Sequence, residues 1–461
     1  MAYEDYSADE NILFKADKLL EPDGSVITRG GEIVLPPNEE RAMQYISMSP
    51  EADKLLQMDG SIKTRSELGG TGGKYTRPND WIEHPIPKDE EFSILLAIFE
   101  KAKNQYSLTI TSKAFTVCTF SIDWGDGLVE EFSVNGSKAV THYYDYKFID
   151  ESTMTTRGYK QALMKIKVIS GVLEGLTFYI GGYRISSMLE VKLCSKNLLS
   201  FTINGTGSPP TKYPYLESVE FIGECNIKTF SLLQCESLMK VKGFDFSKLT
   251  SAQYLFYNCC MLSEVDNIEN LDLSSATSVV QAFYNCRSLR KIGITAPKAT
   301  TLNDTFNGCS SLQEITKLDI PLVTQMSNTF NGCTVLQKLP AIDTSQMSNF
   351  ATFINNCTSL IDAGILDCKS VVSTAYGILQ FYTNNGLSKI QFKNMNANIY
   401  QLHFGQTNLS REMVLEIFES LYDRTSIASP VAKITLSSIP AMSELTAEDK
   451  AIALNKNWTI E

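Results

Sequence analysis

A cysteine recurs about every two dozen residues through the middle of this chain, each time at the same place in a repeated phrase. From the second copy onward, a large apolar residue stands three positions before the cysteine and a leucine three positions after it. Self-similarity with this period predicts a solenoid, in which each coil buries its apolar side against its neighbours. The repeated cysteines are Cys235, Cys259, Cys286, Cys309, Cys333 and Cys357. We predict one stacked internal column from the aromatic residues before them, Phe256, Phe283, Phe306 and Phe330.

The chemistry expected of these cysteines follows from their number and spacing. The chain has 11 cysteines, and an odd number argues against a complete disulfide framework. Equivalent positions in stacked coils lie ~4.8 Å apart, which is within reach of a disulfide. Free cysteine is also a small residue that is often buried, so we predict an internal ladder of reduced thiols. Because no C-x-x-C pair is present and His84, His142 and His403 are far apart in sequence, we expect no metal and no other cofactor.

The overall composition limits the classes of partner. A formal net charge of −11 over 461 residues gives no basic footprint for nucleic acid. No segment approaches the ~20 consecutive apolar residues that a membrane span needs. The first residues lack the positive start and apolar stretch of a secretory signal, so we expect synthesis in the cytoplasm without a signal peptide.

Residues 1–85 contain a second, shorter repeat. Ala16–Arg29 reads ADKLLEPDGSVITR and recurs at Ala52–Arg65 as ADKLLQMDGSIKTR. Asp23-Gly24 and Asp59-Gly60 predict a turn in each copy. Apolar periodicity is too scarce here for an independent core. We therefore predict an extended segment with two equivalent docking points, on a partner or on sister chains.

Residues 86–205 have the pattern of a small antiparallel β-sandwich, because alternating or β-branched segments are separated by turns. The apolar run Phe92–Phe99 fits either a buried strand or a helix. The most specific phrase consists of Asp123, Trp124, Gly125, Asp126 and Gly127, followed by Tyr143.

This phrase resembles the turn and the later aromatic strand of polycystic-kidney-disease-type (PKD) sandwich domains. The resemblance implies that Trp124 and Tyr143 fill the core and that Asp126-Gly127 makes a hairpin turn. Asp123 and Asp126 are open to two readings, a calcium site or carboxylates that cap turn backbone.

Residues 206–400 form the predicted solenoid, and its phrases resemble the BspA-like class of leucine-rich repeats. Asparagine or glycine directly before the five cysteines from Cys259 to Cys357 suits a bend. Residues 401–461 predict a C-terminal cap. It contains a helix with Ser410 as N-cap, a strand at Lys433–Leu436, a second helix with Thr446 as N-cap, and Trp458 as a plug for the last coil.

Sequence motifs of catalysis are missing. We find no nucleophile elbow, P-loop, dinucleotide fingerprint or HExxH, and GGTGGK at Gly69–Lys74 lacks the serine or threonine that a P-loop needs. We therefore predict a protein that is not an enzyme, with a glycan-processing enzyme as a third functional class.

The predicted fold is mainly β with some α: an extended N-terminal segment, a PKD-like sandwich, a leucine-rich-repeat solenoid and an α/β cap. This order resembles bacteriophage tail appendages, in which an anchor and a spacer carry a receptor-facing module. It predicts a virion structural protein of the tail, either a fibre or a baseplate-proximal appendage. We expect residues 1–85 to bind other tail proteins, three copies to form a homo-oligomer, and the solenoid to contact a host surface protein or glycan. The alternative is a bacterial BspA-like surface adhesin.

Overall fold

The structure is a computed structural model that describes residues 75–100, 102, 104–180, 187–205, 215–349, 352–372 and 378–461, and six short strands among the first 74 residues. The chain divides into two compact units, Met1–Tyr75 and Thr76–Glu461. This division precedes the boundary that we predicted at residue 85.

In the first unit the duplicated motif forms the same hairpin twice. β2 (Lys18–Leu20) pairs antiparallel with β3 (Val26–Thr28), and β5 (Lys54–Leu56) pairs antiparallel with β6 (Ile62–Thr64). β1 (Leu13–Phe14) pairs with β4 (Ile33–Val34). The predicted turn residues Asp23-Gly24 and Asp59-Gly60, and the glycine-rich Gly69–Lys74, lie outside the described residues.

The second unit begins with two facing sheets of mainly antiparallel strands. Every second residue of β8 is buried, which is typical of a sheet with one face on the core. The Phe92–Phe99 run forms most of the strand β7 and not a helix. This strand is buried on both faces, which explains its continuous apolar sequence. The strands are β7 (Glu91–Ile98), β8 (Gln105–Ser112), β9 (Val117–Asp123), β10 (Val129–Asn135), β11 (Ser137–Tyr143), β12 (Lys160–Ser170) and β13 (Leu173–Ile180).

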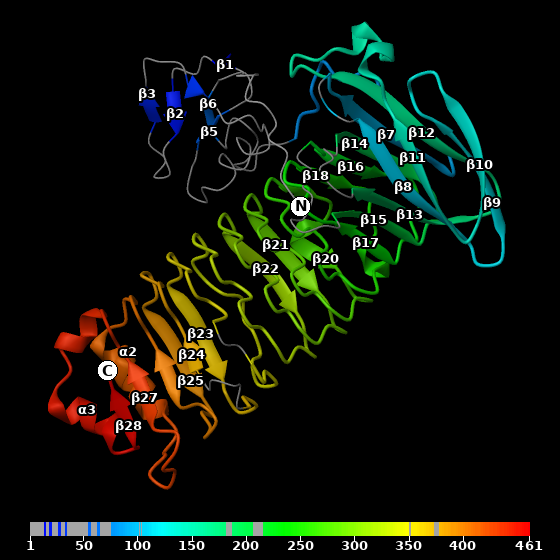
Figure 1. Ribbon diagram of the computed structural model, residues 1–461. Coiled ribbons are helices and arrows are strands. Elements are labelled where there is room, and N and C mark those ends of the chain that lie inside the picture. Colours follow the sequence, from blue (N-terminus) through cyan, green and yellow to red (C-terminus); the bar gives the residue numbers. More distant parts are fainter. Residues whose placement is uncertain are drawn as a thin grey trace, which may run out of the picture. The chain divides into compact units, whose positions relative to one another are not determined.

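Both sheets continue into the solenoid (Figure 1). One has the order β10-β9-β12-β7-β14-β16-β18-β19 and the other β11-β8-β13-β15-β17. Pairing is antiparallel up to β7–β14 and parallel from β14–β16 onward. The sheets therefore run across the boundary predicted between residues 205 and 206. The strands that follow are β14 (Met188–Cys194), β15 (Ser200–Gly205), β16 (Ser218–Phe221), β17 (Thr229–Leu232), β18 (Lys240–Lys242) and β19 (Glu264–Val265).

Each later coil has a strand side and a turn side. The strand side carries β20 (Leu271–Asp272), β21 (Lys291–Thr295), β22 (Glu314–Asp319), β23 (Asp362–Asp367) and β25 (Lys389–Lys393). The turn side holds the segments that end at the repeated cysteines, and its backbone bonds run from coil to coil. For example, Phe283 N donates to Thr305 O at 3.0 Å and Asn285 N donates to Asn307 O at 2.8 Å. Parallel stacking of this kind makes each coil depend on its two neighbours.

The residue before each repeated cysteine has a positive φ, which confirms the predicted bend. Only glycine, and asparagine at moderate cost, adopts this left-handed region readily. The cysteine N–H then closes a tight turn, as Cys309 N does by donating to Phe306 O at 3.1 Å. The left-handed residues are Gln234, Asn258, Asn285, Gly308, Gly332 and Asn356.

The C-terminal cap agrees with its predicted elements. α2 (Arg411–Ser420) has Ser410 as its N-cap and packs on β25, whereas α3 (Ala447–Leu454) begins with a capping box at Thr446. Trp458, at the start of β28, is 1% exposed. The strand predicted at Lys433–Leu436 is β27. The cap's parallel sheet consists of β24 (Ile378–Gln380), β26 (Gln401–His403), β27 (Ala432–Thr435) and β28 (Trp458–Ile460).

The two glycines of the left-handed row should differ in their tolerance of alanine. Gly308 and Gly332 have φ of 77° and 75°, so the left-handed backbone costs alanine about 1 kcal/mol or somewhat more at each. A Cβ at Gly308 would also lie 2.1 Å from Asn285 Oδ1, whereas the nearest atom at Gly332 is 3.5 Å away. We expect Gly308→Ala to lower the thermal unfolding midpoint clearly more than Gly332→Ala. Equal losses would show that Asn285 moves aside freely.

Candidate functional site

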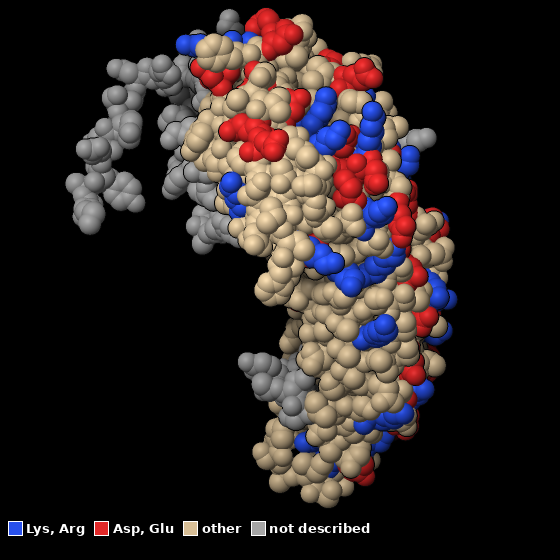
Figure 2. Space-filling view, turned by 90° about the vertical axis from the view of Figure 1, so that its right-hand side faces the viewer, with Lys and Arg blue, Asp and Glu red and all other residues tan. Residues whose placement is uncertain are grey.

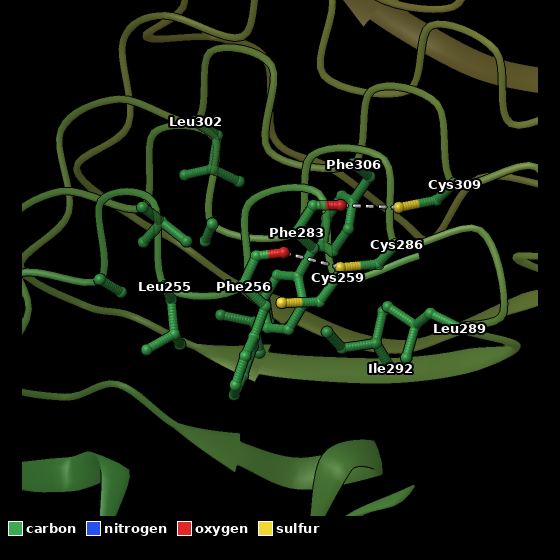
Figure 3. Packing of buried hydrophobic residues seen from close by; sticks show 14 of the residues in the cluster. Leu255, Phe256, Cys259, Phe283, Cys286, Leu289, Ile292, Leu302, Phe306 and Cys309 are labelled. Atoms are coloured by element: carbon green, nitrogen blue, oxygen red, sulfur yellow. Dashed lines mark hydrogen bonds between the residues drawn. The ribbon is translucent and has the colours of Figure 1, made fainter. Parts of the chain in front are cut away.

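The repeated cysteines form an internal ladder of free thiols. All six are fully buried, at 0% exposed. From Cys259 onward each thiol donates a hydrogen bond to a backbone carbonyl of the preceding coil (Figure 3). Cys286 Sγ lies 3.2 Å from Phe256 O and Cys309 Sγ lies 3.1 Å from Phe283 O. The ladder therefore bonds one coil to the next.

Burial sets the acidity of this ladder. It raises the pKa of the Cys357 thiol to about 12 and raises the pKa of Cys309 and Cys333 well above the usual range. The thiolate is the form that attacks disulfides and binds metals. The ladder is therefore held in its protonated, unreactive form, and its role is structural.

The predicted phenylalanine column lies beside the thiols. Ring centroids are 5.7 Å apart between Phe256 and Phe283, 5.8 Å between Phe283 and Phe306, and 5.6 Å between Phe306 and Phe330. All four rings are fully buried, and Phe353 continues the column at 6.1 Å from Phe330. Each coil thus contributes one aromatic ring and one thiol to the same core (Figure 3).

The turn at Asp123–Gly127 corrects one predicted residue. Trp124 is fully buried, but Tyr143 is 66% exposed, so the prediction that Tyr143 fills the core was wrong. The next residue, Tyr144, is 5% exposed, and its hydroxyl donates to Trp124 O at 2.7 Å. A shift of one residue in a strand moves a side chain to the opposite face, and the aromatic pattern did not distinguish the two tyrosines.

The carboxylates of this turn have partners within the protein. Asp123 Oδ1 accepts from Gly125 N at 3.0 Å, and Asp126 Oδ1 accepts from Leu128 N at 3.1 Å. Asp126 Oδ2 lies 2.7 Å from His142 Nε2. The positive φ of 79° at Gly125 and 95° at Gly127 explains the two glycines. Both aspartates therefore cap turn backbone, and among the described residues no group of three His, Cys, Asp or Glu is arranged to hold a metal.

Charged residues on the strand side pair between neighbouring coils. Blue and red side chains alternate along one side of the molecule in Figure 2. Such pairs include Lys291 with Glu314 at 2.8 Å and Lys389 with Asp362 at 3.4 Å. Exposed pairs add at most about 1 kcal/mol each to the stability of the fold. Their main effect is that positive and negative charges balance along this surface.

The turn side has almost no charge. Asp304 is the sole charged residue in the segments 252–258, 279–285, 302–308 and 326–332. Asparagine side chains bond from coil to coil here, as Asn285 Nδ2 does by donating to Asn258 Oδ1 at 2.9 Å. Tyr257 and Tyr284 stack at 4.8 Å beside them. This surface is polar and aromatic, the composition of many protein contact surfaces.

A buried polar cluster, which no sequence pattern predicted, fixes the segment 76–88 to the sheet. Glu190 Oε2 accepts from Arg77 Nε and from His84 Nδ1, each at 2.9 Å, and His84 Nε2 lies 2.8 Å from Ser93 Oγ. Beside this cluster, Trp81 packs on the outer face of β7, which explains why that strand is buried on both faces. The partners are more than one hundred residues apart in sequence, so no local pattern relates them.

The charges in this cluster are set by its hydrogen bonds. Burial alone would raise the pKa of Glu190, but the hydrogen bonds from His84 and Arg77 outweigh it and lower that pKa to about 2. Burial lowers the pKa of His84, despite the opposing pull of Glu190. At neutral pH the cluster therefore contains a carboxylate, a guanidinium and a neutral imidazole.

Comparison with known proteins gives one family match. Residues 230–296 and 300–375 match the family model described as Mycoplasma protein of unknown function, DUF285. The matched residues contain the whole cysteine ladder from Cys235 to Cys357. This match and the β-solenoid fit a BspA-like repeat protein. No curated protein matches the chain. Within the described ranges, no helix is both long and apolar enough to cross a membrane.

Thiol labelling should separate the ladder from the two partly exposed cysteines. Cys194 and Cys260 are half-buried and the other nine cysteines are buried. We expect a disulfide reagent such as Ellman's to modify at most these two thiols in native protein and all 11 in denaturant. A Cys194→Ser/Cys260→Ser variant should react hardly at all before unfolding. Prompt native labelling of that variant would contradict the buried ladder.

Removing the carboxylate of the buried cluster should weaken the second unit. Glu190→Gln leaves Arg77 without its charged partner, so we expect a loss of about 3 kcal/mol at pH 7, measured by denaturant unfolding. The matched control is Glu220→Gln, whose partner Lys242 is on the surface at 3.4 Å, with an expected loss below ~1 kcal/mol.

The same variant should change the response to acid. A carboxyl whose folded pKa is depressed contributes stability above its unfolded pKa of about 4.5, and this contribution is lost as the pH falls toward about 2. His84, with its pKa also lowered, adds a loss that begins below about pH 6.5. Wild-type stability should therefore fall more steeply in acid than that of Glu190→Gln. Parallel pH profiles would contradict this assignment.

Proposed function

We propose that the chain is a structural protein of a bacteriophage tail, either a fibre or a baseplate-proximal appendage, that presents its solenoid for contact with the host surface. The observation that carries the proposal is the division of the chain. A unit with two equivalent hairpins precedes a second unit whose sandwich and solenoid share one continuous core. Two near-identical hairpins suit two equivalent docking points on other tail proteins.

The second unit suits a rigid spacer that ends in a contact surface. A core shared across many coils resists bending between sandwich and solenoid. The sandwich, with its buried Trp124 and the glycine turn before Asp126, supports the further proposal that it is PKD-like. The nearly uncharged turn side, with its stacked Tyr257 and Tyr284, is the surface that we propose for contact with a host protein or glycan. We propose that the chain forms a symmetric homo-oligomer, as most homo-oligomers are symmetric, and that each appendage contains three copies.

A bacterial BspA-like surface adhesin is the second candidate. The observation that favours it is the match of the solenoid to a family described from Mycoplasma. Both candidates are binding modules rather than enzymes. Sustained hydrolysis of a host polysaccharide by purified protein, abolished by one Asp or Glu substitution, would overturn that shared part of the proposal.

Mass spectrometry of purified particles tests the leading proposal. We expect the chain in virions, and its detection in a cell envelope fraction instead would support the adhesin. Deleting both motifs, Ala16–Arg65, should yield a folded protein that fails to enter virions. The control deletes Ala52–Arg65 alone, which leaves one hairpin and should allow partial incorporation. Normal incorporation of the larger deletion would place the attachment elsewhere.

A further inference from the structure

Four lysines gather in a shallow groove at the junction of sandwich and solenoid. The groove has a volume of about 420 Å³, and its charged lining residues are Lys113, Lys196, Lys228, Lys248 and a single carboxylate, Glu174. The whole chain has a net charge of −11, so this is a local reversal of sign. A concave lining of one charge sign concentrates the field and attracts ligands of the opposite sign.

The backbone fixes the spacing of these lysines. Lys113 N donates to Val172 O at 3.0 Å, Leu199 N donates to Glu174 O at 2.8 Å, and Lys228 N donates to Leu199 O at 2.8 Å. Lys196 and Lys228 therefore belong to successive layers of the stack, at about strand spacing, whereas the layer of Glu174 lies between Lys196 and Lys113. A ligand that follows the groove meets the ammonium groups of Lys228 and Lys196 in succession and that of Lys113 beyond Glu174.

Three of these lysines have no carboxylate partner. On the strand side, lysines such as Lys389 pair with an acidic residue of the next coil. In the groove, Lys248 pairs with Asp245 at 3.4 Å, whereas Lys113, Lys196 and Lys228 are exposed and make no ion pair with any described residue. Their positive charge is available to a ligand.

An aromatic side chain stands in the same turn as Lys113. Phe115 is 98% exposed, and its φ of 59° lies in the left-handed region, where a bulky residue is a rare outlier. The turn is held by Thr116, whose hydroxyl donates to Lys113 O at 2.7 Å. Strained backbone of this kind clusters at active sites and ligand contacts.

We infer that this groove binds an anionic polysaccharide, with the ammonium groups of Lys196, Lys228 and Lys113 on its acidic groups and Phe115 against the apolar face of a sugar ring. A groove this shallow offers no deep apolar pocket for the anchor side chains that dominate peptide recognition. Nucleic acid carries one charge per ~1.7 Å of duplex, so the net charge of the chain opposes it more than it opposes a sparsely charged glycan.

This inference deepens the proposed recognition role and rests on it, but it does not require that the chain enters virions. Absence from particles would overturn the virion proposal and leave the binding result unchanged. Failure of the groove to bind would leave virion incorporation unchanged.

The test is calorimetric titration of the full chain with defined polymers at low and at high salt. The probes are polygalacturonate and a phosphomannan as anionic polysaccharides, dextran as the neutral glycan, and oligo(dT) and polyglutamate as other polyanions. We expect binding of polygalacturonate or the phosphomannan, and the tighter of the two identifies the acidic group as carboxylate or phosphate. Binding should weaken as salt screens the charges, and dextran should not bind.

Two lysine pairs give matched variants with the same change in net charge. Lys196→Gln/Lys228→Gln should weaken binding of the anionic glycan at least ~tenfold, whereas Lys389→Gln/Lys393→Gln on the strand side should change it less than ~twofold. Phe115→Ala should weaken glycan binding severalfold without changing its salt dependence. Circular dichroism should show all variants folded, since every substituted side chain is on the surface.

Several outcomes would overturn the inference. It fails if neither anionic glycan binds at low salt, or if the strand-side pair loses as much affinity as the groove pair. Tighter binding of oligo(dT) or polyglutamate would also overturn it, because the groove would then recognise nucleic acid or acidic protein.

Discussion

The rest of the solenoid depends on the tight turn that ends at each repeated cysteine. The turn requires a left-handed residue directly before the cysteine, which is why asparagine or glycine stands there in five coils. With that bend made, the N–H of each cysteine from Cys259 to Cys333 closes its turn, and the thiol bonds to the carbonyl of the preceding coil. The phenylalanine three residues earlier then points inward and stacks on its neighbours at 5.6–5.8 Å. Loss of a buried phenylalanine side chain costs about 3–5 kcal/mol, so the column contributes more than any surface pair.

Electrostatics give the two sides of the coils different characters. On the strand side, acidic and basic residues of adjacent coils pair, which leaves little unbalanced charge for a ligand. On the turn side, amide groups bond to one another from coil to coil. The groove at the start of the solenoid differs because Lys196 and Lys228 lack such partners. The coils are thus neutral or balanced along most of their length, with a positive site where they join the sandwich.

Features encoded by local sequence could be predicted, and features that depend on distant residues could not. The phases of Cys309 and Phe306 followed from the repeat, and the N-caps Ser410 and Thr446 followed from the residues at each helix start. Tyr143 was predicted in the core instead of Tyr144 because adjacent tyrosines give the same sequence signal. The two side chains nevertheless point to opposite faces, and only Tyr144 is buried. The contact between Arg77 and Glu190 joins residues 113 positions apart, so it leaves no periodic signal. The same holds for the groove, where Lys113 comes from the turn between β8 and β9, which belong to different sheets, and Lys228 comes from a coil.

The sandwich shares its two sheets with the solenoid because it covers one of the solenoid's two ends. A parallel stack leaves an open, apolar cross-section at each end, and an uncovered end would expose core side chains and unpaired strand edges. At the C-terminal end, α2 covers β25 and Trp458 is buried beside Tyr422, whose carbonyl accepts from Trp458 Nε1 at 2.9 Å. At the N-terminal end, antiparallel β7 pairs directly with β14, so the sandwich itself closes the stack. With both ends covered, the lateral surfaces remain for contact. The recognition that we propose for the solenoid would therefore use its sides, where the positive groove and the nearly uncharged turn side lie.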